Sequence, residues 1–222
     1  MASPRAWLGQ SVNAGGISLV LRTLLGGRAA LLLPHLQVAD ICSLDWAALR
    51  AAGFEGVIFD KDNTLTAPYA SGAHPPLQPA LDACLSAFGG AACVLSNSAG
   101  LAQFDPRGAE AAAATGALRL PVLAHRLKKP GGGPEAAEAL LGCPASHMVL
   151  VGDRFATDVL FGNRHGMLTV RVAPLQPAAD VPAVRVARAA ELALVAAARR
   201  SGCAPPGHSL APRGCADFLL QT

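Results

Sequence analysis

The fold is decided by one stretch of the chain, Val57-Ile58-Phe59-Asp60-Lys61-Asp62-Asn63-Thr64-Leu65. It opens on large apolar residues, which are typical of a strand that is buried on both faces of a sheet. The apolar run ends abruptly in two aspartates separated by one residue. A chain that leaves the strand at Asp60 can swing Asp62 over the same pocket. The stretch therefore predicts a buried strand that carries two carboxylates at its C-terminal end.

From Phe54 onward, short apolar runs alternate with helix-like segments. Strand-helix alternation of this kind predicts a parallel α/β sheet with helices on both faces. In such sheets ligands bind in the crevice beyond the carboxyl ends of the strands. The predicted strands are Gly56–Phe59, Ala91–Leu95, Pro121–Ala124, His147–Val151 and Leu168–Val172, and the predicted helices are Leu77–Phe88, Pro106–Gly116, Pro134–Leu141, Thr157–Arg164 and Val184–Arg199.

Two carboxylates at one strand end allow nucleophilic and acid-base chemistry together. Asp60 can attack as a nucleophile, which splits one difficult displacement into two easier steps. Asp62 can protonate a leaving group and then activate water. Acids at strand ends also serve as turn formers or helix caps, so the pair alone does not decide between the two interpretations.

Three further motifs follow predicted strands in order. Ser96 and Asn97 come directly after the strand that ends at Leu95, and Lys129 follows the strand around Val122. The strand Val149–Val151 ends in Gly152-Asp153, with Asp158 five residues after Asp153. Each motif alone is compatible with an ordinary turn, a solvated loop or a helix cap.

Together the four motifs resemble those of the haloacid-dehalogenase (HAD) phosphatases. The resemblance implies an HAD-like Rossmannoid α/β fold and a Mg²⁺ ion held by Asp60, the carbonyl of Asp62 and Asp153, with Asp158 in the outer shell or acting through water. It also implies an aspartyl-phosphate intermediate on Asp60. Ser96, Asn97 and Lys129 would bind the phosphoryl group, with Lys129 neutralising charge.

The intervals between the motifs are too short for the large cap domain that many HAD enzymes insert. Residues 63–95 have room for a flap, a helix and a strand, and residues 97–128 for one helix and one strand. We therefore expect an open site, which suits a bulky substrate such as a protein, a nucleic acid or a lipid head group.

A finer resemblance is to the phosphatidylglycerophosphate phosphatases of mitochondria and plastids and their bacterial relatives. It covers residues 19–172 and implies a phospholipid substrate whose terminal phosphate is removed to give phosphatidylglycerol, the precursor of cardiolipin in mitochondria and a thylakoid lipid in plastids. Four stretches carry it: residues 59–66 (FDKDNTLT), 95–100 (LSNSAG), 121–131 (PVLAHRLKKPG) and 151–163 (VGDRFATDVLFGN).

Residues 1–39 differ from the rest of the chain in charge, because they contain Arg5, Arg22 and Arg28 and no acidic residue. This pattern is typical of an organelle-targeting segment. Ile17, Val20, Leu21, Leu24 and Leu25 also fit one face of a helix that could dock on anionic lipid. Targeting, docking, and a helix that simply packs on the domain all remain open. With the resemblance, we expect peripheral association with the mitochondrial inner membrane on its matrix side, or a chloroplast location.

The composition argues against nucleic-acid binding, a cysteine metal site and a membrane-spanning helix. The formal net charge is only +3 and no block of like charges is present, so nucleic acid is not expected as a partner. The six cysteines form no C-x-x-C pair and no zinc-like cluster. The most apolar segment, residues 17–33, is interrupted by Arg22 and Arg28, which argues against a spanning helix.

We expect three parts: residues 1–39 as the targeting or docking segment, residues 40–200 as the phosphatase domain, and residues 201–222 as a poorly ordered tail rich in Gly, Pro and Ala. Nothing in the sequence indicates an oligomeric state. Two other functions stay open: an open-site HAD phosphatase acting on phosphoprotein or a small soluble ester, and a catalytically silent HAD-like scaffold. The scaffold would be expected to lack Asp60 or Asp62.

Overall fold

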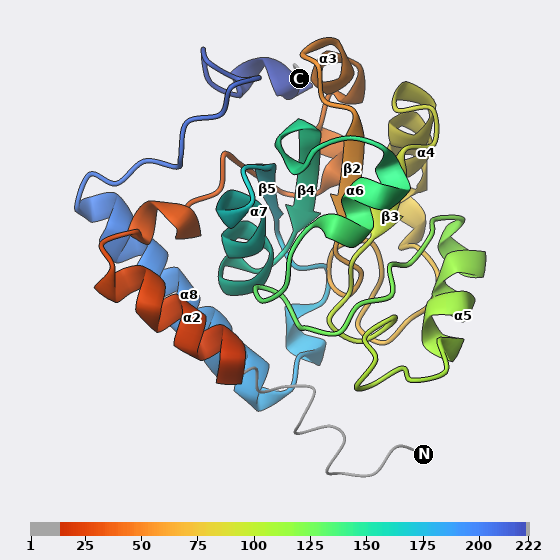
Figure 1. Cartoon of the computed structure of the whole chain (residues 1–222), viewed down its shortest axis with the longest axis horizontal. Coiled ribbons are helices and arrows are strands. Elements are labelled where there is room, and N and C mark those ends of the chain that lie inside the picture. The colour runs from red at the N-terminus through yellow and green to blue at the C-terminus, as the bar shows by residue number, and fades with distance from the viewer. Residues whose placement is uncertain (1–13, 221–222) are drawn as a thin grey trace.

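A five-stranded parallel sheet forms the centre of the molecule, in a computed structural model that describes residues 14–220 (Figure 1). The strand order is β1-β5-β4-β2-β3. The strand that contains the first motif, β2, therefore lies between β4 and β3, and its C-terminal end is flanked by theirs. The strands are β1 (Leu36–Val38), β2 (Gly56–Phe59), β3 (Ala92–Val94), β4 (Met148–Gly152) and β5 (Leu168–Val172).

Helices cover both faces of the sheet, as predicted. Alternate residues of β2 enter different clusters: Val57 and Phe59 pack on one face, and Ile58 packs on the other. The Val57 face is covered by α3 (Trp46–Ala51), α4 (Gln78–Ala87) and α5 (Ala109–Leu118), and the Ile58 face by α6 (Glu135–Leu141) and α7 (Leu160–Arg164). Because β2 is buried on both faces, its apolar sequence runs without alternation.

Two further helices, α2 (Ala14–Leu25) and α8 (Pro182–Arg200), pack against a third cluster beside α7. Leu32, Leu33, Phe155, Val159 and Leu160 form the cluster together with Val195 and Ala198 of α8. From α2, the residues Leu19, Val20 and Leu24 pack against it. Figure 1 shows both helices along the same edge of the molecule.

Part of the apolar helix face predicted for the N-terminal segment packs against the domain. Val20 and Leu24 are partly buried, whereas Leu21 and Leu25 are exposed by 54% and 87%. Ile17 belongs to α2, but its side chain lies outside the described part, as does Arg5. The helix thus packs on the domain and still presents leucines to solvent.

The boundary predicted at residue 40 is wrong. β1, at Leu36–Val38, is a strand of the sheet and pairs in parallel with β5. Leu32 and Leu33 are also fully buried. β1 has only three residues, which are too few to show the alternation of a strand. Residues 36–38 were therefore assigned to the segment before the domain.

The prediction of a strand at Pro121–Ala124 is also wrong. Only an isolated bridge joins Val94 to Val122 at this place, and a second bridge joins Leu101 to His125. Pro121 has no N–H to donate to a ladder, which limits strand pairing here. The segment still runs beside β3 and delivers Lys129 to the strand ends.

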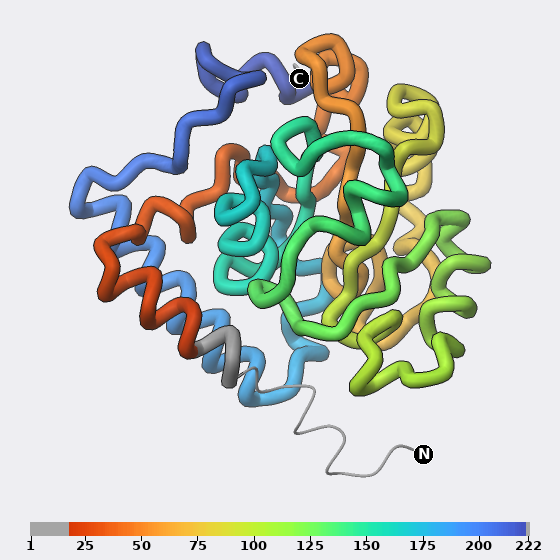
Figure 2. The backbone as a smooth tube through the Cα atoms, viewed as in Figure 1, coloured from red at the N-terminus to blue at the C-terminus, as the bar shows by residue number. Residues whose placement is uncertain are grey.

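The prediction of a poorly ordered tail does not hold for residues 201–220. Figure 2 shows this segment crossing from the end of α8 back to α3. The Asp45 N–H donates to the Phe218 carbonyl at 2.9 Å, Leu44 bridges Leu219, and Phe218 packs edge-on against Phe54. A few buried side chains anchor the tail although its composition has no helical or strand period.

Among the described residues, no helix is both long enough and apolar enough to span a bilayer.

Candidate active site

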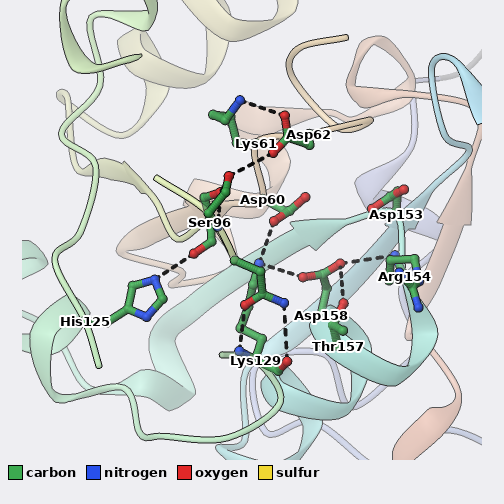
Figure 3. A network of polar contacts seen from close by, with 12 residues as sticks. Asp60, Lys61, Asp62, Ser96, His125, Lys129, Asp153, Arg154, Thr157 and Asp158 are labelled. Atoms are coloured by element: carbon green, nitrogen blue, oxygen red, sulfur yellow. Dashed lines mark hydrogen bonds and ion pairs between the residues drawn. The ribbon is translucent and has the colours of Figure 1, made fainter. Parts of the chain in front are cut away.

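Three carboxylates meet at the C-terminal edge of the sheet (Figure 3). Asp60 follows β2, Asp153 follows β4, and Asp158 lies in the π-helical turn η5 (Phe155–Val159) that leads into α7. One oxygen of each lies within 4.8 Å of the others, and all three residues are buried. The structure therefore brings together three of the four residues predicted to hold a metal.

Lys129 lies between two of these carboxylates. Its Nζ is 2.7 Å from Oδ1 of Asp60 and 2.6 Å from Oδ1 of Asp158, and its side chain is only 1% exposed. The resemblance to the HAD phosphatases implied Lys129 in the site. Lys128 instead lies over the ring of Phe104, with Nζ 4.4 Å from the ring centroid.

The carboxylates carry more negative charge than the neighbouring cations neutralise. Burial raises the pKa of Asp60, and the charges of Asp158 and Asp153 raise it further. Lys129 opposes them, and the resulting pKa of Asp60 is about 8. Burial and the charge of Asp158 likewise raise the pKa of Asp153. Arg188 opposes them, and the resulting pKa of Asp153 is about 6. Burial alone would lower the pKa of Lys129, but Asp158 and Asp60 overcome this and raise it.

This group of oxygens fits a hard divalent cation. Carboxylate oxygens at strand ends are ligands that Mg²⁺ prefers, and it retains water for the rest of its octahedron. A bound cation would stabilise the ionised carboxylates and so oppose the effects that raise their pKa values. Asp60, Asp153 and Asp158 are the residues that could hold such an ion.

Gly152 is required for this geometry. A Cβ atom at this position would lie 2.4 Å from Cγ, 2.5 Å from Cβ and 2.7 Å from Oδ2 of Asp158. A side chain would therefore displace Asp158 from the group. This explains in physical terms why the motif begins with Gly before Asp153.

Asp62 lies apart from the three buried carboxylates. Its Oδ1 accepts from Lys61 Nζ at 2.7 Å and from the Tyr69 N–H at 2.9 Å, and its Oδ2 accepts from Ser98 Oγ at 3.2 Å. These three donors fix the carboxylate at the pocket wall. The Asp62 carboxylate is therefore free of the metal group, which is compatible with the predicted ligation through its carbonyl.

The loop after β3 places Ser96, Asn97 and Ser98 between Asp62 and Lys129. The buried Ser96 hydroxyl accepts from the Ser98 N–H at 3.1 Å, and the Ser96 carbonyl lies 2.6 Å from Nε2 of His125. The side chain of Asn97 bonds to the backbone of Lys129. Asn97 and Ser98, together with Asp62, line the open pocket.

Sequence reasoning missed the residues that α8 brings to the site. Arg188 pairs with Asp153 and, through Nε at 2.6 Å, with Asp180, whose Oδ1 accepts from Asn63 Nδ2 at 2.9 Å. These groups connect α8 to the loops after β2 and β4. Since Arg188 lies 35 residues after Asp153 in no recognisable motif, no local signal could have found it.

A second pair also joins α8 to the fourth motif. Arg154 forms a bidentate ion pair with Glu191, and Glu191 Oε2 accepts from the Phe155 N–H at 3.1 Å. The backbone N–H of Arg154 in turn donates to Asp158 Oδ2 at 3.1 Å. The pair thus fixes the turn that carries Asp158.

The pocket over these residues has a volume of about 140 Å³ and opens to solvent. This space is large enough for a phosphate group with a few waters. Within the described chain, residues 63–95 hold only η3 (Pro75–Leu77), α4 and β3, and residues 97–128 hold only α5. No inserted cap domain covers the site in this part of the chain.

A parallel sheet with these four motifs at one edge is the arrangement that the resemblance to the HAD phosphatases implied. The family model described as mitochondrial PGP phosphatase matches residues 15–175. The chain belongs to this family.

Curated relatives extend the similarity to nearly the whole chain. The chain is 54% identical over 211 residues to "Phosphatidylglycerophosphate phosphatase 1, chloroplastic" of Chlamydomonas reinhardtii, which covers 95% of this chain and 78% of the relative. It is 44% identical over 209 residues to "Phosphatidylglycerophosphate phosphatase 1, chloroplastic/mitochondrial" of Arabidopsis thaliana, covering 94% of this chain but only 60% of that protein.

Among solved structures, a mutant of the thermostable p-nitrophenylphosphatase from Bacillus stearothermophilus is 23% identical and covers 53% of this chain and 44% of its own, with a TM-score of 0.18. The family membership does not depend on this match.

Proposed function

We propose that this protein is a phosphatidylglycerophosphate phosphatase that hydrolyses the terminal phosphate monoester and leaves phosphatidylglycerol. The observation that carries the proposal is the position of Asp60, which lies in a phosphate-sized pocket beside Lys129 in a chain 54% identical to a protein of that name. An aspartate buried beside a lysine at a strand end is suited to covalent phosphoryl transfer.

In the first step an Asp60 carboxylate oxygen attacks phosphorus in line with the departing oxygen. The bond from phosphorus to the glycerol oxygen breaks, and Asp62 gives its proton to that oxygen. The products are phosphatidylglycerol and an aspartyl phosphate. The hydrogen bonds from Lys61, Tyr69 and Ser98 hold the Asp62 carboxylate at the wall of the pocket, within which this exchange of a proton would take place.

In the second step water attacks the same phosphorus atom. Asp62, now ionised, takes a proton from that water, and the bond from phosphorus to Asp60 breaks to release inorganic phosphate. Lys129 and the polar groups of Ser96 and Asn97 would hold the equatorial oxygens in both steps. Lys129 balances the charge that builds on these oxygens, and most of the catalytic effect in phosphoryl transfer comes from such positioning and neutralisation.

We further propose Mg²⁺ as the cofactor, held by Asp60, Asp153 and the carbonyl of Asp62, with Asp158 as a ligand or a partner through water. When bound, this ion would supply positive charge to the phosphoryl oxygens. The three buried carboxylates and the raised pKa values of Asp60 and Asp153 support the assignment.

The open pocket supports a lipid substrate. The head group of a lipid can reach Asp60 while the acyl chains stay outside, because residues 63–128 contain no inserted domain that would cover the site. The exposed Leu21 and Leu25 and the acid-free N-terminal segment support peripheral membrane association. The relatives' names support a chloroplast or mitochondrial location. For a mitochondrial protein we propose peripheral association with the matrix side of the inner membrane.

The test is phosphate release from mixed micelles of phosphatidylglycerophosphate, beside an aryl phosphate and a phosphopeptide, with and without Mg²⁺. We expect preferential release from the lipid, reduced on the order of 10³-fold or more in Asp60→Asn. Asp82→Asn, on the exposed side of α4, is the matched control and should retain activity. Activity on the soluble esters alone would refute the substrate, and no activity on any ester would refute the enzyme.

A further inference from the structure

The solvent-facing side of α8 has an unusual composition. All of its exposed residues are either apolar or arginine: Pro182, Ala183, Arg185, Val186, Ala189, Ala190, Leu192, Ala193, Ala197, Arg199 and Arg200. The only acidic residue of the helix, Glu191, is buried against Arg154. A solvated helix normally mixes both signs of charge on this side.

These exposed residues lie on one continuous side of the helix, because the partly buried Val184 and the buried Glu191, Val195 and Ala198 repeat at helical spacing on the other. Val186 is 70% exposed and Leu192 is 52% exposed. We call the exposed set the α8 outer face.

The opposite side of the same helix reaches the active site. Val184 and Arg188 line the pocket that contains Asp60, and Arg188 pairs with Asp153. A surface that docks on the α8 outer face would therefore contact the same helix that lines the pocket. The outer face and the site share one rigid element.

We infer that the α8 outer face is a docking surface for an anionic lipid bilayer. Arginine beside exposed aliphatic side chains suits this surface, since guanidinium groups meet anionic head groups while the aliphatic groups enter the boundary of the acyl region. A second copy of the chain would bring like-charged arginines together. The inference deepens the proposed function and rests on it, because it names the surface through which the site meets a membrane-borne substrate.

The neighbouring helix α2 carries the same pattern. Its exposed side and the turn after it present Leu21, Leu25, Arg22 and Arg28. α2 packs against the same cluster as Val195 and Ala198 of α8 (Figure 1). The pattern thus extends along the edge of the molecule that α2 and α8 form.

Vesicle sedimentation of the full chain tests the inference. The vesicles are phosphatidylcholine with phosphatidylglycerol, beside phosphatidylcholine alone, and the variants are Arg185→Gln/Arg200→Gln and Val186→Asn/Leu192→Gln. All four residues are exposed and lie outside the catalytic group. We expect the parent protein to bind only the anionic vesicles. The arginine variant should bind them on the order of thirtyfold more weakly, and the aliphatic variant about tenfold more weakly.

The matched control is Arg107→Gln/Leu140→Gln, which removes an exposed arginine and an exposed leucine elsewhere and should bind as the parent does. Aryl phosphate hydrolysis should be unchanged in every variant, which separates docking from chemistry. Failure of the parent to bind anionic vesicles, or equal binding by parent and both α8 variants, would overturn the inference. Neither result bears on hydrolysis of detergent-dispersed phosphatidylglycerophosphate, so the proposed function stands or falls separately.

Discussion

The side chain of Asn97 holds the backbone of Lys129 at two points. Its Oδ1 accepts from the Lys129 N–H at 2.7 Å, and its Nδ2 donates to the Lys129 carbonyl at 3.3 Å. The residues are 32 positions apart, so the contact joins the loop after β3 to the segment that delivers the buried lysine. Sequence reasoning expected Asn97 to bind substrate, and the contact gives it a positioning role as well.

Replacing Asn97 with Ala should therefore impair catalysis through Lys129. Both backbone groups of Lys129 lose their partner, which costs about 1–3 kcal/mol for buried polar groups. We expect kcat on phosphatidylglycerophosphate to fall by about one to two orders of magnitude as Nζ loses its position between Asp60 and Asp158. Steady-state kinetics measure the fall. Gln78→Ala removes an exposed amide on α4 and should leave kcat unchanged. An unchanged kcat in Asn97→Ala would refute the positioning role.

The packing of Gly152 against Asp158 leads to a second prediction. In Gly152→Ala the new Cβ would lie 2.4 Å from Cγ of Asp158, so the carboxylate must move away from Lys129. We expect a loss of at least about 10²-fold in kcat/KM and a destabilisation of about 1–3 kcal/mol.

Gly116→Ala is the matched control for that experiment. Gly116 is exposed in α5 and a Cβ there meets nothing within 4 Å. This change should stabilise the protein by about 0.5–1 kcal/mol, because alanine loses less backbone entropy in a helix. Kinetics and thermal unfolding measure both variants, and full activity in Gly152→Ala would contradict the geometry.

The strand-end residues could be predicted because the signal is local. The strands predicted at Gly56–Phe59 and Leu168–Val172 have the observed bounds, and the helix predicted at Pro134–Leu141 begins one residue later, at Glu135. Asp60 and Asp153 directly follow predicted strands, and the order of the motifs added Lys129 and Asp158 through the resemblance that it carries. A parallel sheet necessarily brings such residues to one edge.

The contribution of α8 could not be predicted, because it depends on tertiary packing. Nothing in the sequence around Arg188 or Glu191 indicates that they meet Asp153 and Arg154. The same reason explains the tail, where a few contacts such as Phe218 with Phe54 order a segment without any periodicity. Long-range pairs of this kind leave no pattern within one stretch of chain.

The tail also meets the N-terminal segment through two histidines. The rings of His35 and His208 lie 5.7 Å apart edge to face. Nδ1 of His35 accepts from the Thr169 N–H at 3.0 Å, so this nitrogen carries no proton. Burial, and after it the charge of His208, lowers the pKa of His35 to about 4.

This pKa predicts how stability depends on pH. In the unfolded chain His35 has the ordinary histidine pKa of 6.5, so between pH 6.5 and about 4 the unfolded state binds more protons than the folded state. The contribution of neutral His35 is therefore complete above pH 6.5 and is lost as the pH falls toward 4. In His35→Asn an amide oxygen replaces Nδ1 as acceptor without titrating. We expect Tm to decline less steeply with acid in this variant than in the parent, by a few degrees across the window. His74→Asn should follow the parent curve, and parallel curves for the parent and His35→Asn would show that His35 does not titrate with folding.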